Sequence, residues 1–159
     1  MSYLLDANVF IQAKNLHYGL DFCPAFWDWL IQNSAAKKVF SIEKVEDELL
    51  AIGHQLAHWA SKRGSGFFLK PDAKLLVALS TVSAWATGQS YDPAAVNTFL
   101  LVADYYLVGH ALAHGQTVVT HEIASTSTKK IKIPDACIGL GIKVVSPTRC
   151  CGQNVHASY

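Results

Sequence analysis

Short apolar runs alternate along this chain with longer stretches in which apolar residues recur every three or four positions. The first run, residues 3–5, stops abruptly at Asp6, and Asn8 follows where it can cap a helix. This pattern predicts a buried strand that turns into a helix. Further strands are expected at 39–41, 117–120 and 142–145, and residues 131–133 are expected to be extended.

Helices are expected between these runs. Between residues 43 and 61 the apolar positions follow the helical period, with Gly53 as a point of division. Gly115 ends a second, strongly apolar helix predicted over 97–114. Other helices are predicted at 23–31, from 72 to 87 and from Pro134 onward. Strands separated by helices predict an α/β fold, a three-layer α/β/α sandwich with a central, mainly parallel sheet.

The composition is that of a packed domain. The chain has 159 residues, 51% of them hydrophobic and 16% charged, which excludes an intrinsically disordered chain and a coiled coil. No linker or internal repeat is visible. Residues 1–159 are therefore expected to form a single domain, with a mobile C-terminal tail from about residue 148.

Charge and cysteine usage limit the kinds of partner and the cellular compartment that we expect. The net charge of +1 creates no field that would gather nucleic acid over the whole molecule, so a polyanion must be held locally. No secretory signal precedes Asp6 and polar residues interrupt the apolar stretches, so we expect a cytoplasmic protein without a membrane span. The four cysteines show no CxxC spacing and are expected to be free thiols.

Four acidic residues occupy positions typical of a ligand site in a parallel sheet. Asp6 and Glu122 lie at the ends of predicted strands, where ligands collect, and Glu48 lies on the helix after the second strand. Asp104 lies in an otherwise apolar helix, where an uncompensated carboxylate is costly. Each acid alone has an ordinary structural explanation, but together they predict a site for Mg²⁺ or Mn²⁺, which can support hydrolysis of a phosphodiester.

The same segments carry a family resemblance. Residues 3–11, YLLDANVFI, resemble the opening of PIN-domain ribonucleases, and VEDEL at 45–49 is similar to the Glu-Leu segment of that family. ADYYLVGHA at 103–111 and VVTHE at 118–122 resemble its acidic helix and its strand that ends on Thr and an acid. With residues 131–137, the chain resembles a PIN-like branch related to the VapC toxins of bacterial toxin–antitoxin pairs.

This resemblance implies a specific function. It implies a PIN-like α/β/α sandwich and a metal-dependent endoribonuclease that cleaves single-stranded RNA, the toxin of a pair held inactive by a cognate antitoxin protein. The metal site would consist of Asp6, Glu48, Asp104 and Glu122. Two positions stay open, because Asp135 could replace Glu122 and Asp47 could replace Glu48. Asn8 and Thr120 would orient the acids.

Basic and aromatic residues are the candidates for partner contacts. Lys129, Lys130 and Lys132 follow the last predicted acid and are the first candidates for RNA binding. Further basic residues that could contact phosphate are Lys37, Lys38, Lys62, Arg63 and Arg149. The helix that contains Trp27 and Trp29 is a candidate surface for an antitoxin or a homodimer, provided that these tryptophans are exposed.

Two other functional classes remain open. A catalytically idle PIN-like binding module would share the fold but act only through a partner. A zinc-binding interaction protein would use His54 with His58 or His110 with His114, because each pair is spaced four residues apart on one helical face. Neither pair has the Glu that zinc hydrolases of this spacing use as a base, so structural roles are favoured for these histidines.

Overall fold

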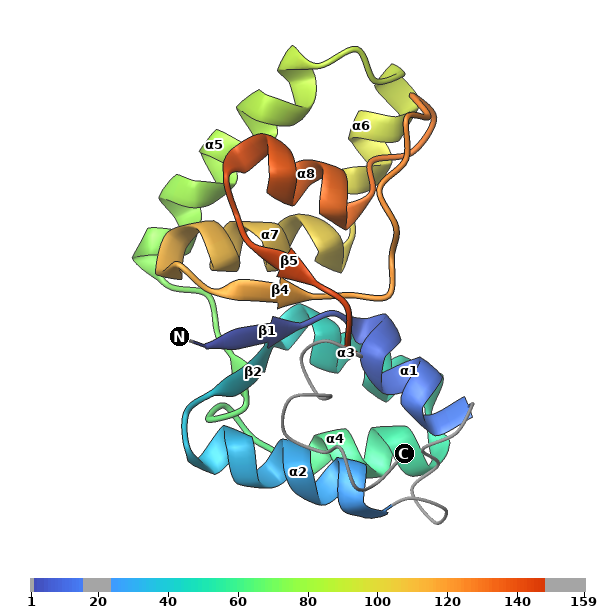
Figure 1. The fold of residues 1–159 in the computed structure, drawn as a ribbon, viewed down its shortest axis with the longest axis vertical. Helices are drawn as coiled ribbons and strands as arrows, with labels where there is room; N and C mark the ends of the chain where they lie inside the picture. The colour runs from blue at the N-terminus through green and yellow to red at the C-terminus, as the bar shows by residue number, and fades with distance from the viewer. Residues whose placement is uncertain (1, 16–23, 148–159) are drawn as a thin grey trace.

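A computed structural model describes residues 2–15 and 24–147 of the chain (Figure 1). The strands form one five-stranded, all-parallel sheet in the order β3-β2-β1-β4-β5. This confirms the predicted α/β class and the parallel sheet. The strands are β1 (Tyr3–Leu5), β2 (Val39–Ile42), β3 (Phe68–Leu69), β4 (Thr117–Val119) and β5 (Val144–Val145).

Helices connect the strands and cover both faces of the sheet (Figure 1). Gly53, with φ 82°, separates α3 from α4, and Gly115, with φ 65°, ends α7, as the sequence predicted for both glycines. The helices are α1 (Ala7–Asn15), α2 (Pro24–Ala35), α3 (Glu43–Ile52), α4 (His54–Ser61), α5 (Ala73–Gly88), α6 (Pro93–Phe99), α7 (Ala103–His114) and α8 (Ile133–Leu140).

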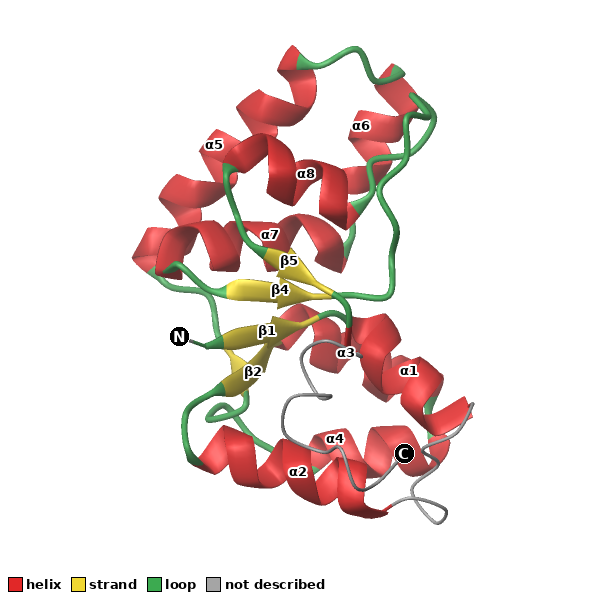
Figure 2. Cartoon of the chain, in the orientation of Figure 1, coloured by secondary structure: helices red, strands yellow, loops and turns green. Residues whose placement is uncertain are grey.

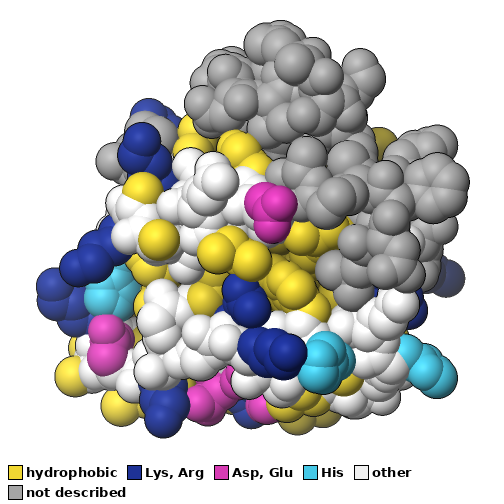
Figure 3. Space-filling view, turned by 90° about the horizontal axis from the view of Figure 1, so that it is seen from below, with side chains coloured by type: hydrophobic (Ala, Val, Ile, Leu, Met, Phe, Trp, Pro, Cys, Tyr) yellow, Lys and Arg dark blue, Asp and Glu magenta, His cyan; other side chains and the backbone are white. Residues whose placement is uncertain are grey.

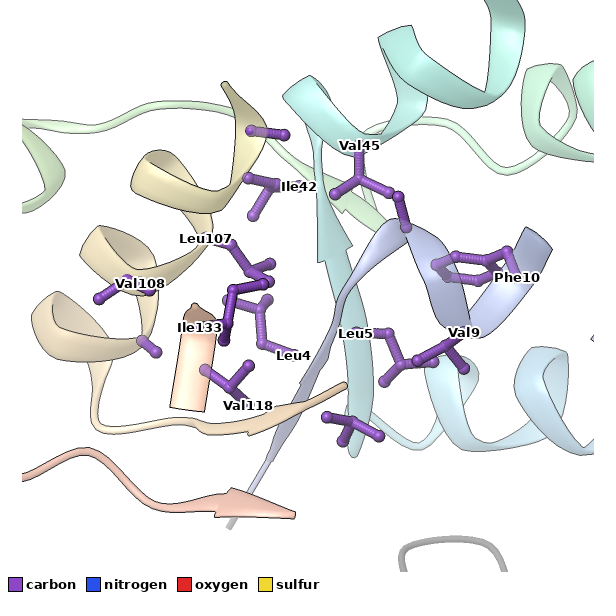
Figure 4. Close-up of a cluster of buried hydrophobic side chains, with 14 of the residues drawn as sticks. Leu4, Leu5, Val9, Phe10, Ile42, Val45, Leu107, Val108, Val118 and Ile133 are labelled. Carbon is purple, nitrogen blue, oxygen red and sulfur yellow. The ribbon is translucent and has the colours of Figure 1, made fainter. Parts of the chain in front are cut away.

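The central strand β1 builds the core on both of its faces. Leu4 and Leu5 are buried and point to opposite sides, as successive residues of a strand must. Figure 4 shows Leu4 facing α7 and the Ile133 side chain, whereas Leu5 lies with Val9 on the side of α1. The strand is therefore held rigidly up to Asp6, the first candidate site residue.

The predicted helix over 97–114 was wrong, because two helices occupy this stretch. The chain bends by 70° between α6 and α7, and Val102 is extended with φ −110° and ψ 167°. Each helix buries its own apolar residues, including Phe99 on α6 and Leu107 on α7, so an apolar run continuous in sequence is divided between two packing directions. Asp104 consequently lies in the first turn of α7 instead of within a longer helix, and a carboxylate is favoured at a helix N-terminus.

Smaller boundary differences follow from short strands. β3 was not predicted, because its two residues pair with β2 but show no strand-like alternation of their own. β5 is confined to Val144–Val145, and Ile133 begins α8 instead of extending the segment before it. Elements of two or three residues depend on their neighbours in the sheet, which a local pattern does not record.

The proposed aromatic docking surface was also wrong. Trp27 and Trp29 are only 4% and 8% exposed, and the Trp27 ring packs 5.0 Å from the Trp59 ring. Both tryptophans therefore belong to the hydrophobic core, and Trp27 packs between α2 and α4. The most exposed of the large apolar side chains in the described residues lie elsewhere, on α5, between α6 and α7, after β4 and on α8: Leu76, Val77, Leu101, Ile123 and Ile138.

Some predictions fall outside the described residues, namely the mobile tail from about 148, Arg149, Cys23, Cys150 and Cys151. Cys137 is a buried free thiol, as predicted. Within residues 2–15 and 24–147, no single helix is long and apolar enough to cross a membrane, and α6 with α7 meets that length and composition only as a bent pair.

Candidate metal centre

The sheet topology brings three of the predicted acids to one edge. β1 and β4 are neighbouring parallel strands with Leu5 opposite Val119, so Asp6 and Thr120 leave the sheet side by side. Figure 2 shows the loops after β1 and β4 leaving the sheet at the same edge. Glu122 lies two residues further along the loop after β4. Asp104 comes to the same place from the first turn of α7.

Thr120 is the centre of the hydrogen-bond network in this region. Its hydroxyl donates to Asp6 Oδ2 at 2.8 Å and accepts hydrogen bonds from Asn8 Nδ2 at 3.3 Å and from the Glu122 backbone N–H at 3.0 Å. Asn8 Oδ1 in turn accepts from the His121 N–H at 3.2 Å. Asn8 and Thr120 therefore tie the start of α1 to the loop after β4 and fix one oxygen of Asp6.

Burial and the charges of neighbouring acids make Asp6 and Asp104 hard to ionise. Asp6 is only 6% exposed, and its burial, followed by the charges of Asp104 and Glu122, raises its pKa to about 7 against the opposing hydrogen bond from Thr120. Burial is also the largest cause that raises the pKa of Asp104, to about 6, and the charges of Glu122 and Glu48 add to it. The charge of Glu122 thus raises the pKa of both aspartates, and a cation at this cluster would relieve that repulsion.

Glu122 is anchored at this cluster by the start of α8. Its Oε2 accepts a hydrogen bond from the Ile133 N–H at 2.8 Å, and Lys130 Nζ lies 3.9 Å from its Oε1. Asp135 is engaged elsewhere, because its carboxylate accepts from the Ser125 N–H at 3.1 and 3.3 Å. Of the two alternatives for the fourth acid, Glu122 is therefore the one that faces Asp6 and Asp104.

Of the two candidate acids on α3, Glu48 and Asp47, only Glu48 acts on the acid cluster. Glu48 contributes to the raised pKa of Asp104, and burial raises the pKa of Glu48 itself, although the residue lies at the surface. Asp47 is exposed and acts instead on Glu46, whose pKa is raised first by burial and then by the Asp47 charge. Glu48 is therefore the α3 carboxylate that faces the cluster.

The chemistry of these residues fits a hard divalent cation. The cluster offers only carboxylate oxygens, which Mg²⁺ and Mn²⁺ prefer, and the described residues give buried Asp6 no ion-pair partner. In their present positions, however, the described His, Cys, Asp and Glu side chains include no group of three that could hold a metal ion. The acids face one another across the site without forming a closed coordination shell.

The histidine pairs do not form a comparable site. His54 and His58 are both exposed on α4. His110 is buried and its ring stacks on that of His114 at 6.0 Å, while His114 Nε2 pairs with Asp72 Oδ2 at 2.8 Å. Burial lowers the pKa of His110, so its neutral form is favoured. These contacts give His110 and His114 structural roles at the other end of α7 from Asp104.

The predicted RNA-binding lysines lie near the acids along the chain. Lys129, Lys130 and Lys132 belong to the segment between β4 and α8 that also carries Glu122. Lys129 and Lys130 are exposed, and Lys132 is half-buried. Lys130 lowers the pKa of Asp104 and pairs with Glu122, which sequence spacing alone did not reveal.

Comparisons with known proteins agree with this architecture. A chain in the structure described as "Structure of FitAB bound to IR36 DNA fragment" matches with a TM-score of 0.56 and 18% sequence identity. The match covers 91% of this chain and 94% of that chain, and it shows a PIN-like fold. No curated protein matches by sequence.

A family model described as "Domain of unknown function (DUF4411)" matches residues 3–154, which include every candidate acid and both residues that hold Asp6 in place. The chain is therefore a member of the DUF4411 family with a PIN-like fold.

Proposed function

We propose that this protein is a divalent-metal-dependent endoribonuclease that cleaves single-stranded RNA. The observation that carries the proposal is the meeting of Asp6, Asp104 and Glu122 at the carboxyl edge of the sheet, with a pKa of about 7 for Asp6. Strongly perturbed acids in a cluster are typical of functional sites. Asp6, Asp104, Glu122 and Glu48 would hold Mg²⁺ or Mn²⁺.

Each residue of the centre has a distinct task in this proposal. When bound, the divalent ion supplies the positive charge that stabilises the phosphodiester transition state and activates water. Thr120 fixes one oxygen of Asp6, and Asn8 fixes Thr120. The N-terminus of α8 holds Glu122 toward Asp104. Lys130, within 3.9 Å of Glu122, is placed to contact a phosphate group of the RNA.

Purified protein tests the proposal directly. We expect cleavage of single-stranded RNA with Mg²⁺ or Mn²⁺ and none after addition of EDTA, because the acids themselves do not attack phosphodiesters. Asp6→Asn should abolish cleavage, whereas Asp135→Asn, which removes an acid outside the cluster, should retain it. Cleavage that persists in EDTA contradicts the proposal. Single-stranded DNA belongs in the same assay, because FitAB was solved with a DNA fragment.

We further propose that the protein acts in the cytoplasm as the toxin of a toxin–antitoxin pair. Two strongly exposed apolar side chains support a protein partner near the acids: Leu101 is 83% exposed just before α7, and Ile123 is 81% exposed beside Glu122. Expression of the chain alone should slow bacterial growth, and expression of Asp6→Asn should not. Unimpaired growth with active protein in the cell argues against a toxin. Light scattering of the purified protein shows whether it forms a homodimer.

A catalytically idle binding module is the second candidate. The observation that favours it is the lack, among the described residues, of three side chains already close enough to hold an ion. Mn²⁺ binding by calorimetry distinguishes the two functions, because an idle module should not bind Mn²⁺ at these acids. In either case we propose that residues 1–159 act as one domain, which the family match over 3–154 supports.

A further inference from the structure

A cavity lies at the opposite edge of the sheet from the acids. It has a volume of about 390 Å³ and is formed by the end of α2, the start of β2, the end of α4 and the loop that leads to β3. Because all strands are parallel, the start of β2 is far from the edge where β1 and β4 end (Figure 1). We call it the Arg63 cavity, after one of its lining residues.

Three cations line the Arg63 cavity. Lys37, Lys62 and Arg63 are among its lining residues, and no acidic residue is. Figure 3 views the molecule from below and shows dark blue side chains set among yellow ones, with a hollow between them. Three positive charges without an acid attract an anion, and the attraction is stronger in a partly enclosed cavity than in open solvent.

Two buried donors of the lining residues have no acceptor. Trp59 is only 7% exposed, and its indole Nε1 finds no hydrogen-bond partner, nor does the buried Nε of Arg63. The Arg63 guanidinium lies over the Trp59 ring, with Cζ 5.2 Å from the ring centroid, so packing fixes the guanidinium in place. A buried donor without an acceptor costs free energy, and a bound anion would supply the acceptor.

The rest of the lining is mainly apolar. Its apolar residues are Ile31, Ala35, Phe40 and Phe67, and Ser34 and Gly66 complete it. The Phe67 ring packs edge-on against the Trp59 ring, with the centroids 5.7 Å apart, so each ring restricts the movement of the other. The volume falls within the range of small-molecule sites, so the occupant is a small molecule or the end of a chain.

We propose that the Arg63 cavity binds a phosphate monoester that carries a flat aromatic group, as a nucleoside monophosphate does. Lys37, Lys62 and Arg63 would hold the phosphate, because a guanidinium donates two parallel hydrogen bonds to phosphate oxygens and two lysines balance a dianion. Phe40 and Phe67 would contact the base. A free nucleotide and the 5′-phosphorylated end of an RNA share this chemistry.

Calorimetric titration of metal-free protein tests the site without any contribution from the acid cluster. The probes are AMP, adenosine and inorganic phosphate, with protein that has been treated with chelator and dialysed. AMP should bind, inorganic phosphate should bind more weakly, and adenosine should not bind detectably. Adenosine binding as tight as that of AMP, or no AMP binding, overturns the proposal. A 5′-phosphorylated dinucleotide that binds more tightly than AMP assigns the site to RNA ends, and equal binding assigns it to free nucleotides.

Variants locate the binding. Arg63→Gln should weaken AMP binding about tenfold or more, as expected for loss of a charged hydrogen-bond donor, while Lys74→Gln, which removes a charge on α5, should not change it. Trp59→Phe keeps an aromatic ring and removes only the N–H, and it should weaken binding severalfold. Thermal unfolding confirms that each variant is folded. Unchanged AMP binding in folded Arg63→Gln overturns the proposal, whatever the outcome of the nuclease assay.

Discussion

At the scale of single residues, the candidate metal centre depends on one hydroxyl group. Thr120 is only 2% exposed. Its hydroxyl forms hydrogen bonds with Asp6, Asn8 and the backbone of Glu122, three groups that come from two different parts of the chain. Its hydrogen bond is also the largest influence that lowers the pKa of Asp6. The orientation and the charge of Asp6 therefore both depend on Thr120.

Replacement of Thr120 tests this role. Thr120→Val keeps the shape of the side chain but removes the hydroxyl, so it should lower RNA cleavage about 10–100-fold, the usual range for residues that orient metal ligands. Thr120→Ser keeps the hydroxyl and should stay within severalfold of the wild type. Initial cleavage rates at several Mn²⁺ concentrations provide the measurement. Equal activity of the Val and Ser variants would show that Asp6 needs no such support.

Asp6 should also govern how stability depends on pH. Its pKa of about 7 in the folded protein exceeds the ordinary value of 3.8, so between these values the folded protein binds a proton that the unfolded chain has lost. The free energy of unfolding of the metal-free protein should therefore fall as the pH rises through this window. Asp6→Asn removes this titration and should be the more stable protein at pH 8, with a difference that shrinks toward pH 4.

The size of this effect is measurable by thermal unfolding in EDTA. One pKa unit corresponds to about 1.4 kcal/mol, and 1 kcal/mol shifts the melting temperature of a domain of this size by about 2–4 °C. A gain of several degrees at pH 8 is expected for Asp6→Asn, and Mn²⁺ should raise the melting temperature of the wild type only. A variant that is less stable at every pH would mark Asp6 as a structural residue.

At the scale of elements, local signals predicted those structures that are decided locally. Asp6 after an apolar run gave the end of β1, and glycines with positive φ gave the ends of α3 and α7. The break before Asp104 was missed, because the apolar residues on both sides of it satisfy one helical period equally well. Only the packing of α6 and α7 in different directions separates them.

The contact between α5 and α8 offers a test of element packing. A Cβ placed on Gly139 of α8 would lie 2.3 Å from Trp85 Nε1, and a rigid indole cannot yield as a flexible side chain does. Gly139→Ala should therefore lower the free energy of unfolding by about 1–3 kcal/mol, although alanine favours helices. Gly88→Ala at the end of α5, where nothing lies within 4 Å, should be neutral or stabilising. Chemical denaturation compares the two.

At the scale of the whole molecule, the net charge is only +1, so the positions of the charged residues matter more for binding than the total charge does. The acids lie in four separate segments of the sequence, and the parallel sheet with α7 brings three of them together. The choice between Glu122 and Asp135 could not be made from the sequence. It depends on which carboxylate accepts from the Ile133 N–H at the start of α8 and which accepts from the Ser125 N–H.

The loop before α8 should also set how RNA binding responds to salt. Three hydrogen bonds hold the segment between β4 and α8. Glu122 accepts from the Ile133 N–H and Asp135 from the Ser125 N–H, and the Asp92 N–H donates to the Thr128 carbonyl. Lys130 lies 3.9 Å from Glu122, and Lys129 and Lys132 belong to the same segment, so under the proposed function all three are candidates to contact the phosphates of a substrate. Each phosphate contact with a single strand contributes about 0.7 to the slope of log affinity against log salt concentration.

Removal of two of these lysines should therefore change the slope by a known amount. Lys129→Gln with Lys132→Gln should lower it by about 1.4 and weaken binding to all RNA sequences alike, because phosphate contacts carry no sequence information. Lys74→Gln with Lys143→Gln removes the same charge away from the acid edge and should leave the slope unchanged. Fluorescence anisotropy in EDTA, which prevents cleavage, measures both pairs. Equal slopes for the two double variants would mean that RNA does not pass over the loop before α8.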